Sequence, residues 1–99
     1  MIARSESPTG PFERRPDDHV LLESSDAWIG PGHNAVATDA SGADWIVYHA
    51  IDPERPFQPA IDAVRRPMLI DRLEWVDGWP QLGDAPSSLP QAAPEAADR

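Results

Sequence analysis

The chain has 99 residues, of which 40% are hydrophobic, with 12 prolines, 6 glycines and no cysteine. This length allows one small domain with a modest core, and the lack of cysteine excludes a disulfide framework and a thiolate metal site. Seventeen acidic against eight basic residues give a net charge of −9, so nucleic acid and anionic membrane surfaces are poor partners. No window approaches the roughly 18 apolar residues of a membrane span, and no signal-peptide pattern indicates a cytoplasmic or a secreted localisation.

The first part of the chain reads as a strand stub, a turn and a return. Residues 1–4 are mostly apolar, residues 5–11 are rich in turn formers, and residues 12–14 resume an extended pattern. Since a folded domain seldom begins so abruptly, we interpret residues 1–32 as the end of another unit and a connecting loop.

The stretch from Gly30 to His49 predicts a β-hairpin with arms at residues 33–38 and 45–50. Gly42 lies in the intervening turn, where it can supply a positive φ. In the second arm both alternating sets of side chains are largely apolar, so this strand needs cover on both of its faces. The two sets are Trp45 and Val47 on one face, and Ile46 and Tyr48 on the other.

A second hairpin is predicted from strands at residues 67–76 and 79–82, joined by Asp77-Gly78, a strong hairpin-turn dipeptide. Residues 52–59 form a loop interrupted by prolines. Residues 84–99 are rich in proline, alanine and serine and are predicted to be disordered. The sequence therefore predicts an all-β fold, an antiparallel four-stranded meander of the kind that forms one blade of a β-propeller.

Four motifs follow these strands in order. They are Gly-Pro-Gly-His-Asn from residue 30, Asp-Trp-Ile-Val-Tyr-His-Ala from residue 44, Arg-Pro-Met-Leu-Ile-Asp from residue 66 and Trp-Val-Asp-Gly-Trp-Pro from residue 75. Together they resemble the last blade of glycoside hydrolase family 43, the five-bladed propeller arabinanases, arabinofuranosidases and β-xylosidases. The run Ala-Arg-Ser-Glu-Ser-Pro-Thr-Gly-Pro-Phe from residue 3 is similar to the end of the preceding blade. The resemblance covers residues 2–83 and implies that residues 33–83 form the final blade.

The resemblance also implies that the catalytic residues lie outside this chain. Enzymes of the family hydrolyse O-glycosidic bonds in arabinose- or xylose-containing plant polysaccharides with inversion, using a base aspartate, a second aspartate and an acid glutamate on earlier blades. One carboxyl group protonates the leaving oxygen while another activates water across the sugar ring. No position of this chain matches these three residues. We therefore expect a C-terminal fragment or a reading frame that starts at an internal methionine, inactive without the missing N-terminal blades.

His33 is the strongest candidate for a functional residue. The resemblance implies that it points into the central channel beneath the active site. In some members of the family this histidine binds a calcium-type ion, and water molecules complete the coordination shell of the ion. Without the resemblance, a buried histidine bonded to the backbone is the commoner role, and one imidazole is a weak calcium ligand. Trp28, in the loop before Gly30, is a weaker candidate for contact with a sugar.

The remaining histidines and tryptophans have structural interpretations. His49 is expected to cap the end of its strand through a hydrogen bond, and Asp18 and His19 to lie in a solvated loop. No two histidines have the spacing of a zinc site. Trp45 and Trp75 lie in apolar strands and are expected to pack within the blade.

Asp71 and Glu74 are the carboxylates inside a predicted strand. Because they are three residues apart, they project to opposite faces and cannot act as a catalytic pair. We expect Asp71 to pair with an arginine such as Arg66 or Arg72.

Two other functions stay open for the chain. It can be a non-catalytic small β domain that binds a sugar or an ion, or a subunit that completes another propeller. A clean monomer with cooperative unfolding would favour the first, whereas disorder rescued by an upstream partner chain would favour a fragment or a subunit.

Overall fold

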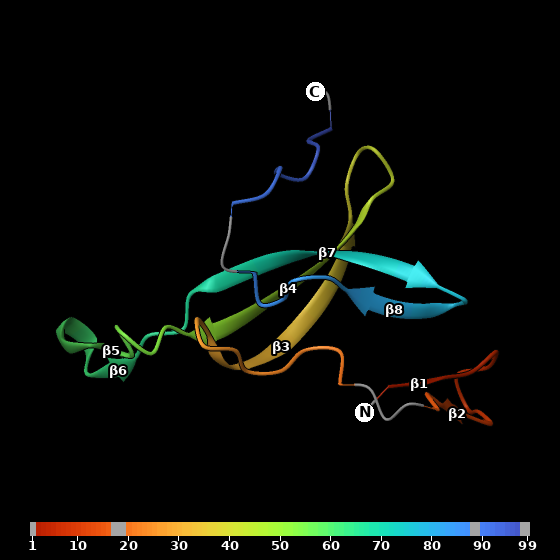
Figure 1. The fold of residues 1–99 in the computed structure, drawn as a ribbon, viewed down its shortest axis with the longest axis horizontal. Coiled ribbons are helices and arrows are strands. Elements are labelled where there is room, and N and C mark those ends of the chain that lie inside the picture. The colour runs from red at the N-terminus through yellow and green to blue at the C-terminus, as the bar shows by residue number, and fades with distance from the viewer. Residues whose placement is uncertain (1, 17–19, 88–89, 98–99) are drawn as a thin grey trace.

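The computed structural model describes residues 2–16, 20–87 and 90–97, and its main unit is one antiparallel sheet (Figure 1). The elements in chain order are β1 (Ala3–Arg4), β2 (Glu13–Arg14), β3 (Ile29–Thr38), β4 (Asp44–Ile51), β5 (Phe57–Gln58), the 3-10 turn η1 (Pro59–Ile61), β6 (Ala63–Val64), β7 (Met68–Val76) and β8 (Trp79–Leu82). The four-stranded sheet has the order β3-β4-β7-β8, and β1-β2 and β5-β6 are separate two-stranded ladders. The predicted all-β class and four-stranded meander are confirmed. The search for a helix long and apolar enough to cross a membrane found none among the described residues.

The observed strands are close to the predicted ones, with one clear difference. The strand β8 has its predicted limits, β4 is one residue longer than predicted at each end, and β7 begins one residue later than predicted. The strand β3 begins at Ile29 rather than at residue 33, because Ile29 and Gly32 also pair with β4 across two register shifts. A Gly-Pro-Gly segment reads as a turn, but two bulges allow it to continue the ladder.

Two tight turns set the register of the sheet. In the turn between β3 and β4, the Asp39 carboxylate accepts bonds from the N–H groups of Ser41 and Ala43, and Gly42 has a φ of 87°. In the turn between β7 and β8, Asp77 and Gly78 have φ values of 52° and 74°. Positive φ at both central residues is typical of the type I′ turn, whose twist matches that of a two-residue hairpin.

The core lies on one face of the sheet, which we call face A. It contains the fully or nearly fully buried side chains Ile46, Tyr48, Ala50, Leu73 and Leu82. Half-buried residues from the loop before β3 and from the segment after β8 pack against this cluster, and they are Leu21, Leu22, Trp28 and Ala85. The chain therefore covers the centre of face A with its own residues, whereas Val36 and Trp75 on this face are 56% and 54% exposed.

The opposite face, face B, is covered unevenly. Trp45 is only 5% exposed; its Nε1–H donates to Asp39 at 3.0 Å, and the guanidinium of Arg72 lies 5.8 Å from its ring centre. By contrast, Met68 and Val76 on the same face are 74% and 49% exposed. Apolar side chains of β7 therefore face solvent on this side of the sheet.

Two expectations about strand β7 were wrong. Asp71 is 3% exposed, and no arginine among the described residues pairs with it. Its carboxylate accepts bonds from the Tyr48 hydroxyl and from Gln91 Nε2. Trp75 is 54% exposed, and its indole N–H donates to Asp44 at 2.8 Å at the rim of the sheet. Trp45, in contrast, is buried as predicted.

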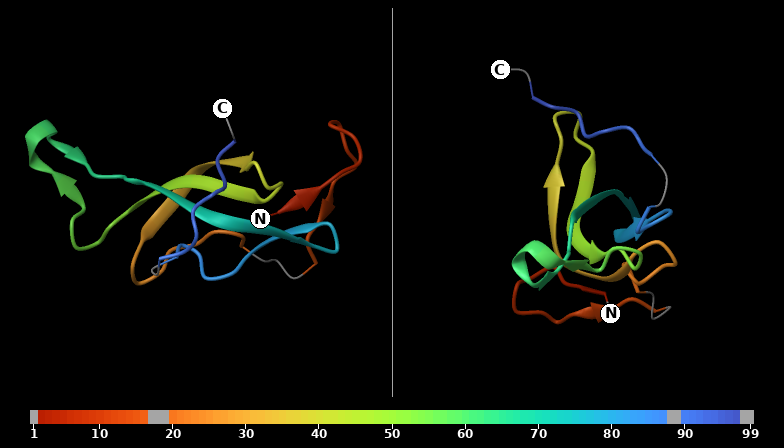
Figure 2. Two further views of the ribbon diagram at one scale, coloured as in Figure 1. Left: turned by 90° about the horizontal axis from the view of Figure 1, so that it is seen from above. Right: turned by 90° about the vertical axis from the view of Figure 1, so that its left-hand side faces the viewer.

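The molecule is extended for its length. Its ladders β1-β2 and β5-β6 lie at opposite ends (Figures 1 and 2). The radius of gyration is 15.7 Å, against about 13 Å for a compact domain of this size. The accessible surface is 7219 Å², whereas a compact monomer of this mass exposes about 5,600 Å². The fold thus buries less surface than an independent domain of 99 residues normally does.

Candidate functional site

Two histidines and one arginine meet where β3 begins and β4 ends. The rings of His33 and His49 are stacked, with centroids 5.8 Å apart and planes inclined by 28°. Arg66, just before β7, donates from Nε to His49 Nδ1 at 2.7 Å. We call His33, His49 and Arg66, with the backbone of Gly30, the histidine–arginine cluster.

Local backbone geometry places each member of the cluster. His33 has a φ of 51° and lies where the register of β3 shifts, so the chain presents its ring beside His49. Gly30 also has a positive φ, of 60°, and a Cβ there would lie 3.6 Å from Arg66 Nη1. Because 3.6 Å is an ordinary van der Waals distance, this position favours glycine for its positive φ and not for space.

Arg66 joins the first strand of the sheet to the second. Its Nη2 donates to the carbonyl oxygen of Gly30 in β3 and to that of His49 in β4, the latter at 3.3 Å. Its Nη1 makes no hydrogen bond within the described part of the chain. The planar guanidinium is thus held by the sheet through Nη2, whereas Nη1 has no partner among the described residues.

The cluster is suited to binding hydroxyl or carboxylate oxygens. Because His49 Nδ1 accepts a bond from Arg66, the proton of a neutral His49 ring is on Nε2. That N–H and the free Arg66 Nη1 are both donors. No hydrogen bond or ion pair connects a carboxylate to the cluster among the described residues, so the cluster lacks the acid and base of a hydrolytic centre.

The predicted site residues are not all brought together. His33 lies in the cluster and is exposed, not buried. Trp28 is half-buried against the core on face A, whereas His49 belongs to face B, so the structure does not bring Trp28 into the cluster. The solvated loop expected at Asp18 and His19 lies outside the residues that the structure describes.

The described residues do not fit a calcium ion. Calcium prefers six to eight oxygen ligands, whereas His33 has a histidine and a guanidinium as its neighbours in the cluster. The described ranges contain no group of three or more histidine, cysteine or acidic side chains that could hold a metal. A calcium site would need most of its ligands from outside this chain.

The carboxylates with shifted pKa values are shifted in the wrong direction for a general acid. Hydrogen bonds from the Ser41 hydroxyl and the Glu95 N–H hold the pKa of Asp39 well below its usual range. A hydrogen bond from Thr38, followed by one from Trp75, lowers the pKa of Asp44. A glycosidase acid needs a raised pKa, so these two aspartates act as turn and strand anchors.

The sequence alone did not indicate that Arg66 belongs to the candidate site. We expected this arginine beside Asp71 and gave His49 only a capping role. The register provides the signal, because His49 pairs with Met68 and places Arg66 at the same end of the sheet. His49 does bond to a neighbour at the strand end as expected, but that neighbour is the arginine of the cluster.

Comparison with known proteins gives one family. The model of the family described as Glycosyl hydrolases family 43 matches residues 1–80 of the 99-residue chain. No curated protein matches the chain. The matched range includes the histidine–arginine cluster and the whole sheet up to the start of β8.

Proposed function

The chain belongs to glycosyl hydrolases family 43, and from this membership we propose that it is the closing blade of a propeller glycosidase. In this proposal the complete enzyme hydrolyses arabinose- or xylose-containing polysaccharides with inversion of configuration. This chain supplies the histidine–arginine cluster, and earlier blades supply the three catalytic carboxylates. The observation that carries the proposal is the family match, which extends across a sheet with the four-stranded order of a blade.

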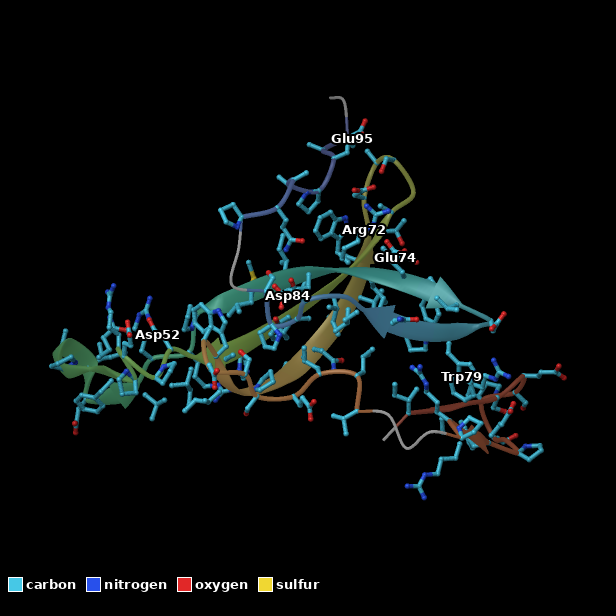
Figure 3. All side chains as sticks on the ribbon, viewed as in Figure 1. Asp52, Arg72, Glu74, Trp79, Asp84 and Glu95 are labelled. Carbon is cyan, nitrogen blue, oxygen red and sulfur yellow. The ribbon has the colours of Figure 1, made fainter. Side chains whose placement is uncertain are left out.

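The ladder β1-β2 supports a second sheet next to this one. Arg4 in β1 lies over the ring of Trp79, 4.1 Å from its centre, and donates to the carbonyl oxygen of Asp77 at 2.8 Å. Figure 3 shows Trp79 at the end of the sheet that is nearest to this ladder. Residues Arg15 and Pro16 line a groove together with Val76, Trp79 and Gln81 of face B. The ladder is thus the outer end of a preceding sheet that continues over face B.

The exposed apolar side chains of face B agree with such a neighbour. Sheets pack with their apolar faces about 10 Å apart. Met68 and Val76 are the exposed apolar side chains of β7 on this face, and a neighbouring blade would cover them. The large accessible surface of the chain has the same explanation.

In the complete enzyme, the cluster would hold the sugar rather than carry out the chemistry. Arg66 Nη1 and His49 Nε2–H are donors for hydroxyl oxygens, and bonds that strengthen in the transition state raise the rate. A calcium ion bound with the help of His33 stays a prediction for the complete propeller.

Activity measurements with and without the other blades test this proposal. We expect the purified chain to release no product from p-nitrophenyl arabinofuranoside or p-nitrophenyl xyloside. Addition of a polypeptide that carries the other four blades of a family 43 propeller should restore hydrolysis. Hydrolysis by the chain alone would overturn the proposal, and so would failure to bind that polypeptide.

Replacement of His33 by alanine tests the role of the cluster in the assembled enzyme. We expect the His33→Ala variant to lower kcat/KM at least tenfold, equivalent to about 1.4 kcal/mol of transition-state stabilisation. Gln58→Ala, in the exposed strand β5, is the matched control. Activity of His33→Ala equal to that of the control would refute a functional role for this histidine.

A further inference from the structure

The outer edge of strand β7 is only half covered by strand β8. The ladder between them joins residues 73–76 to residues 79–82. Residues 68–72 of β7 have no strand beside them on that side within the described part of the chain. An open edge of this kind presents unpaired backbone groups to other chains.

The segment after β8 lies along this open edge. Ala85 packs against the core and Pro86 is buried. The side-chain amide of Gln91 donates to the carbonyl oxygen of Ile70 at 3.0 Å and to Asp71 at 3.2 Å. The N–H of Ser87 also donates to Asp71, at 3.4 Å.

The far end of the segment is attached to the turn between β3 and β4. The N–H of Glu95 donates to Asp39 Oδ2 at 3.0 Å, and its carbonyl oxygen accepts from the N–H of Ala40 at 2.9 Å. Figure 3 shows Glu95 beside this turn. The same carboxylate oxygen of Asp39 accepts the bond from Trp45, so the segment bonds to a side chain that the sheet already holds in place.

We infer that residues 85–87 and 91–95 form an edge strap, which takes the place of a longer β8 and prevents β7 from pairing with a second copy of the chain. The strap is attached at three places, the core, the β7 edge and the β3–β4 turn. Proteins commonly protect open edges with a covering loop. The strap lies outside residues 1–80, so the inference does not depend on the proposed function.

Hydrogen–deuterium exchange on the full chain tests whether the strap is in place. We expect the amides of Ala40 and Glu95 to exchange at least tenfold more slowly than in an unstructured peptide, because both donate hydrogen bonds. Exchange at the free-peptide rate would overturn the strap. The amides of β4, measured in the same experiment, report on the sheet itself and keep the two results separate.

Two substitutions remove individual strap contacts. Glu95→Pro removes the N–H that bonds to Asp39, and Glu95→Ala is its control because it keeps that group. Gln91→Ala removes both bonds to β7, and Gln81→Ala, an exposed glutamine on β8, is its control. We expect Glu95→Pro and Gln91→Ala, but not the controls, to accelerate exchange at Ala40 at least threefold.

Sedimentation measurements then test what the strap prevents. We expect the Gln91→Ala/Glu95→Pro double variant to have a higher weight-average mass than the parent chain at equal concentration. The Gln81→Ala/Glu95→Ala control should match the parent. An unchanged mass in the double variant would overturn the protective role, whatever the outcome of the activity measurements.

Discussion

At the scale of single residues, Arg66 connects parts of the molecule that the sequence separates. Its guanidinium bonds to the backbone of β3, to the backbone of β4 and to the ring of His49. The planar fork of arginine allows this, because its N–H groups point in fixed directions that a lysine cannot reproduce. Both the start of the sheet and the geometry of the candidate site therefore depend on one side chain.

Replacement of Arg66 by lysine should lower stability. A lysine can keep only part of the bonding, and we expect a loss of about 1 kcal/mol because the site is exposed to water. The urea midpoint measures the change at constant slope. Arg55→Lys is the control, since the Arg55 guanidinium makes no hydrogen bond or ion pair within the described residues. Equal midpoints for the two variants would contradict the bridging role of Arg66.

The ionisation of Tyr48 links the stability of the core to pH. Burial, followed by the hydrogen bond to Asp71, raises the pKa of Tyr48 far above its ordinary 10.0. The folded chain then holds this proton more tightly than the unfolded chain. Its contribution to stability is complete below pH 10 and is lost as pH rises beyond that value.

An absorbance titration tests this prediction, because Tyr48 is the single tyrosine of the chain. We expect no tyrosinate signal from the folded chain at pH 10.0, where the same chain in concentrated urea should be about half ionised. An identical titration in the two solvents would show that the hydroxyl is not buried.

At the scale of elements, the turn between β7 and β8 also anchors the ladder β1-β2. Arg4 lies over Trp79 and bonds to Asp77, and Arg15 donates to the carbonyl oxygen of Pro80 at 3.0 Å. A cation over an indole ring contributes about 0.5–1 kcal/mol at an exposed site. Gly78 is favoured here for its positive φ, and a Cβ at this position would lie 2.9 Å from Arg4 Nη1, so the flexible end of the Arg4 side chain would have to move.

Alanine at position 78 should therefore be costly. We expect Gly78→Ala to destabilise the chain by about 1–2 kcal/mol, since a Cβ is unfavourable in the left-handed region, and to displace Arg4. The control is Gly83→Ala, because a Cβ at Gly83 has nothing within 4 Å and should change stability by less than about 0.5 kcal/mol. The thermal unfolding midpoints of both variants test this prediction. Equal midpoints for the two variants would show that Gly78 is replaceable.

At the scale of the whole molecule, the sheet is well formed but the chain does not close around it. The loop before β3 and the segment after β8 cover the centre of face A, but both faces keep apolar side chains in solvent. These are Val36 and Trp75 on face A, and Met68 and Val76 on face B. A radius of gyration of 15.7 Å reflects the two ladders that extend from opposite ends. The chain is thus more extended than a compact domain of the same length.

Calorimetry should detect this incomplete burial. The heat-capacity change of unfolding follows the apolar surface exposed, and a compact chain of this length gives about 1.2–1.5 kcal/mol/K. We expect a value below this range for the chain alone. A value within the range would contradict an incomplete fold, since the chain would then bury as much apolar surface as an independent domain.

The strands could be predicted because their signals are local. Gly42 and Asp77-Gly78 mark the turns, and the alternation in residues 45–50 gives the faces. The start of β3 could not be predicted from the sequence, because a bulge depends on how the strand pairs with its partner and not on its own residues alone. The partner of Asp71 was missed for a similar reason, since Gln91 lies 20 residues away in a segment without periodicity. Of the candidate site, the Gly-Pro-Gly-His-Asn motif drew attention to His33, whose functional role stays a prediction, whereas its contact with His49 required the register.

The two bulges of β3 also limit which changes in chain length the site can accept. Each register shift between Ile29 and Ala35 adds one residue on the β3 side, yet Ile29, Gly32 and Ala35 all pair with β4 residues of the same face. A bulge therefore absorbs its extra residue locally, and the paired residues on either side keep their faces. Deletion of one residue at a shift should replace that bulge by regular pairing, whereas one residue added between Ala35 and Thr38, where the pairing is regular, should either reverse the face of its neighbours or create a new bulge. Natural length variants are then expected between Ile29 and Ala35 rather than between Ala35 and Thr38.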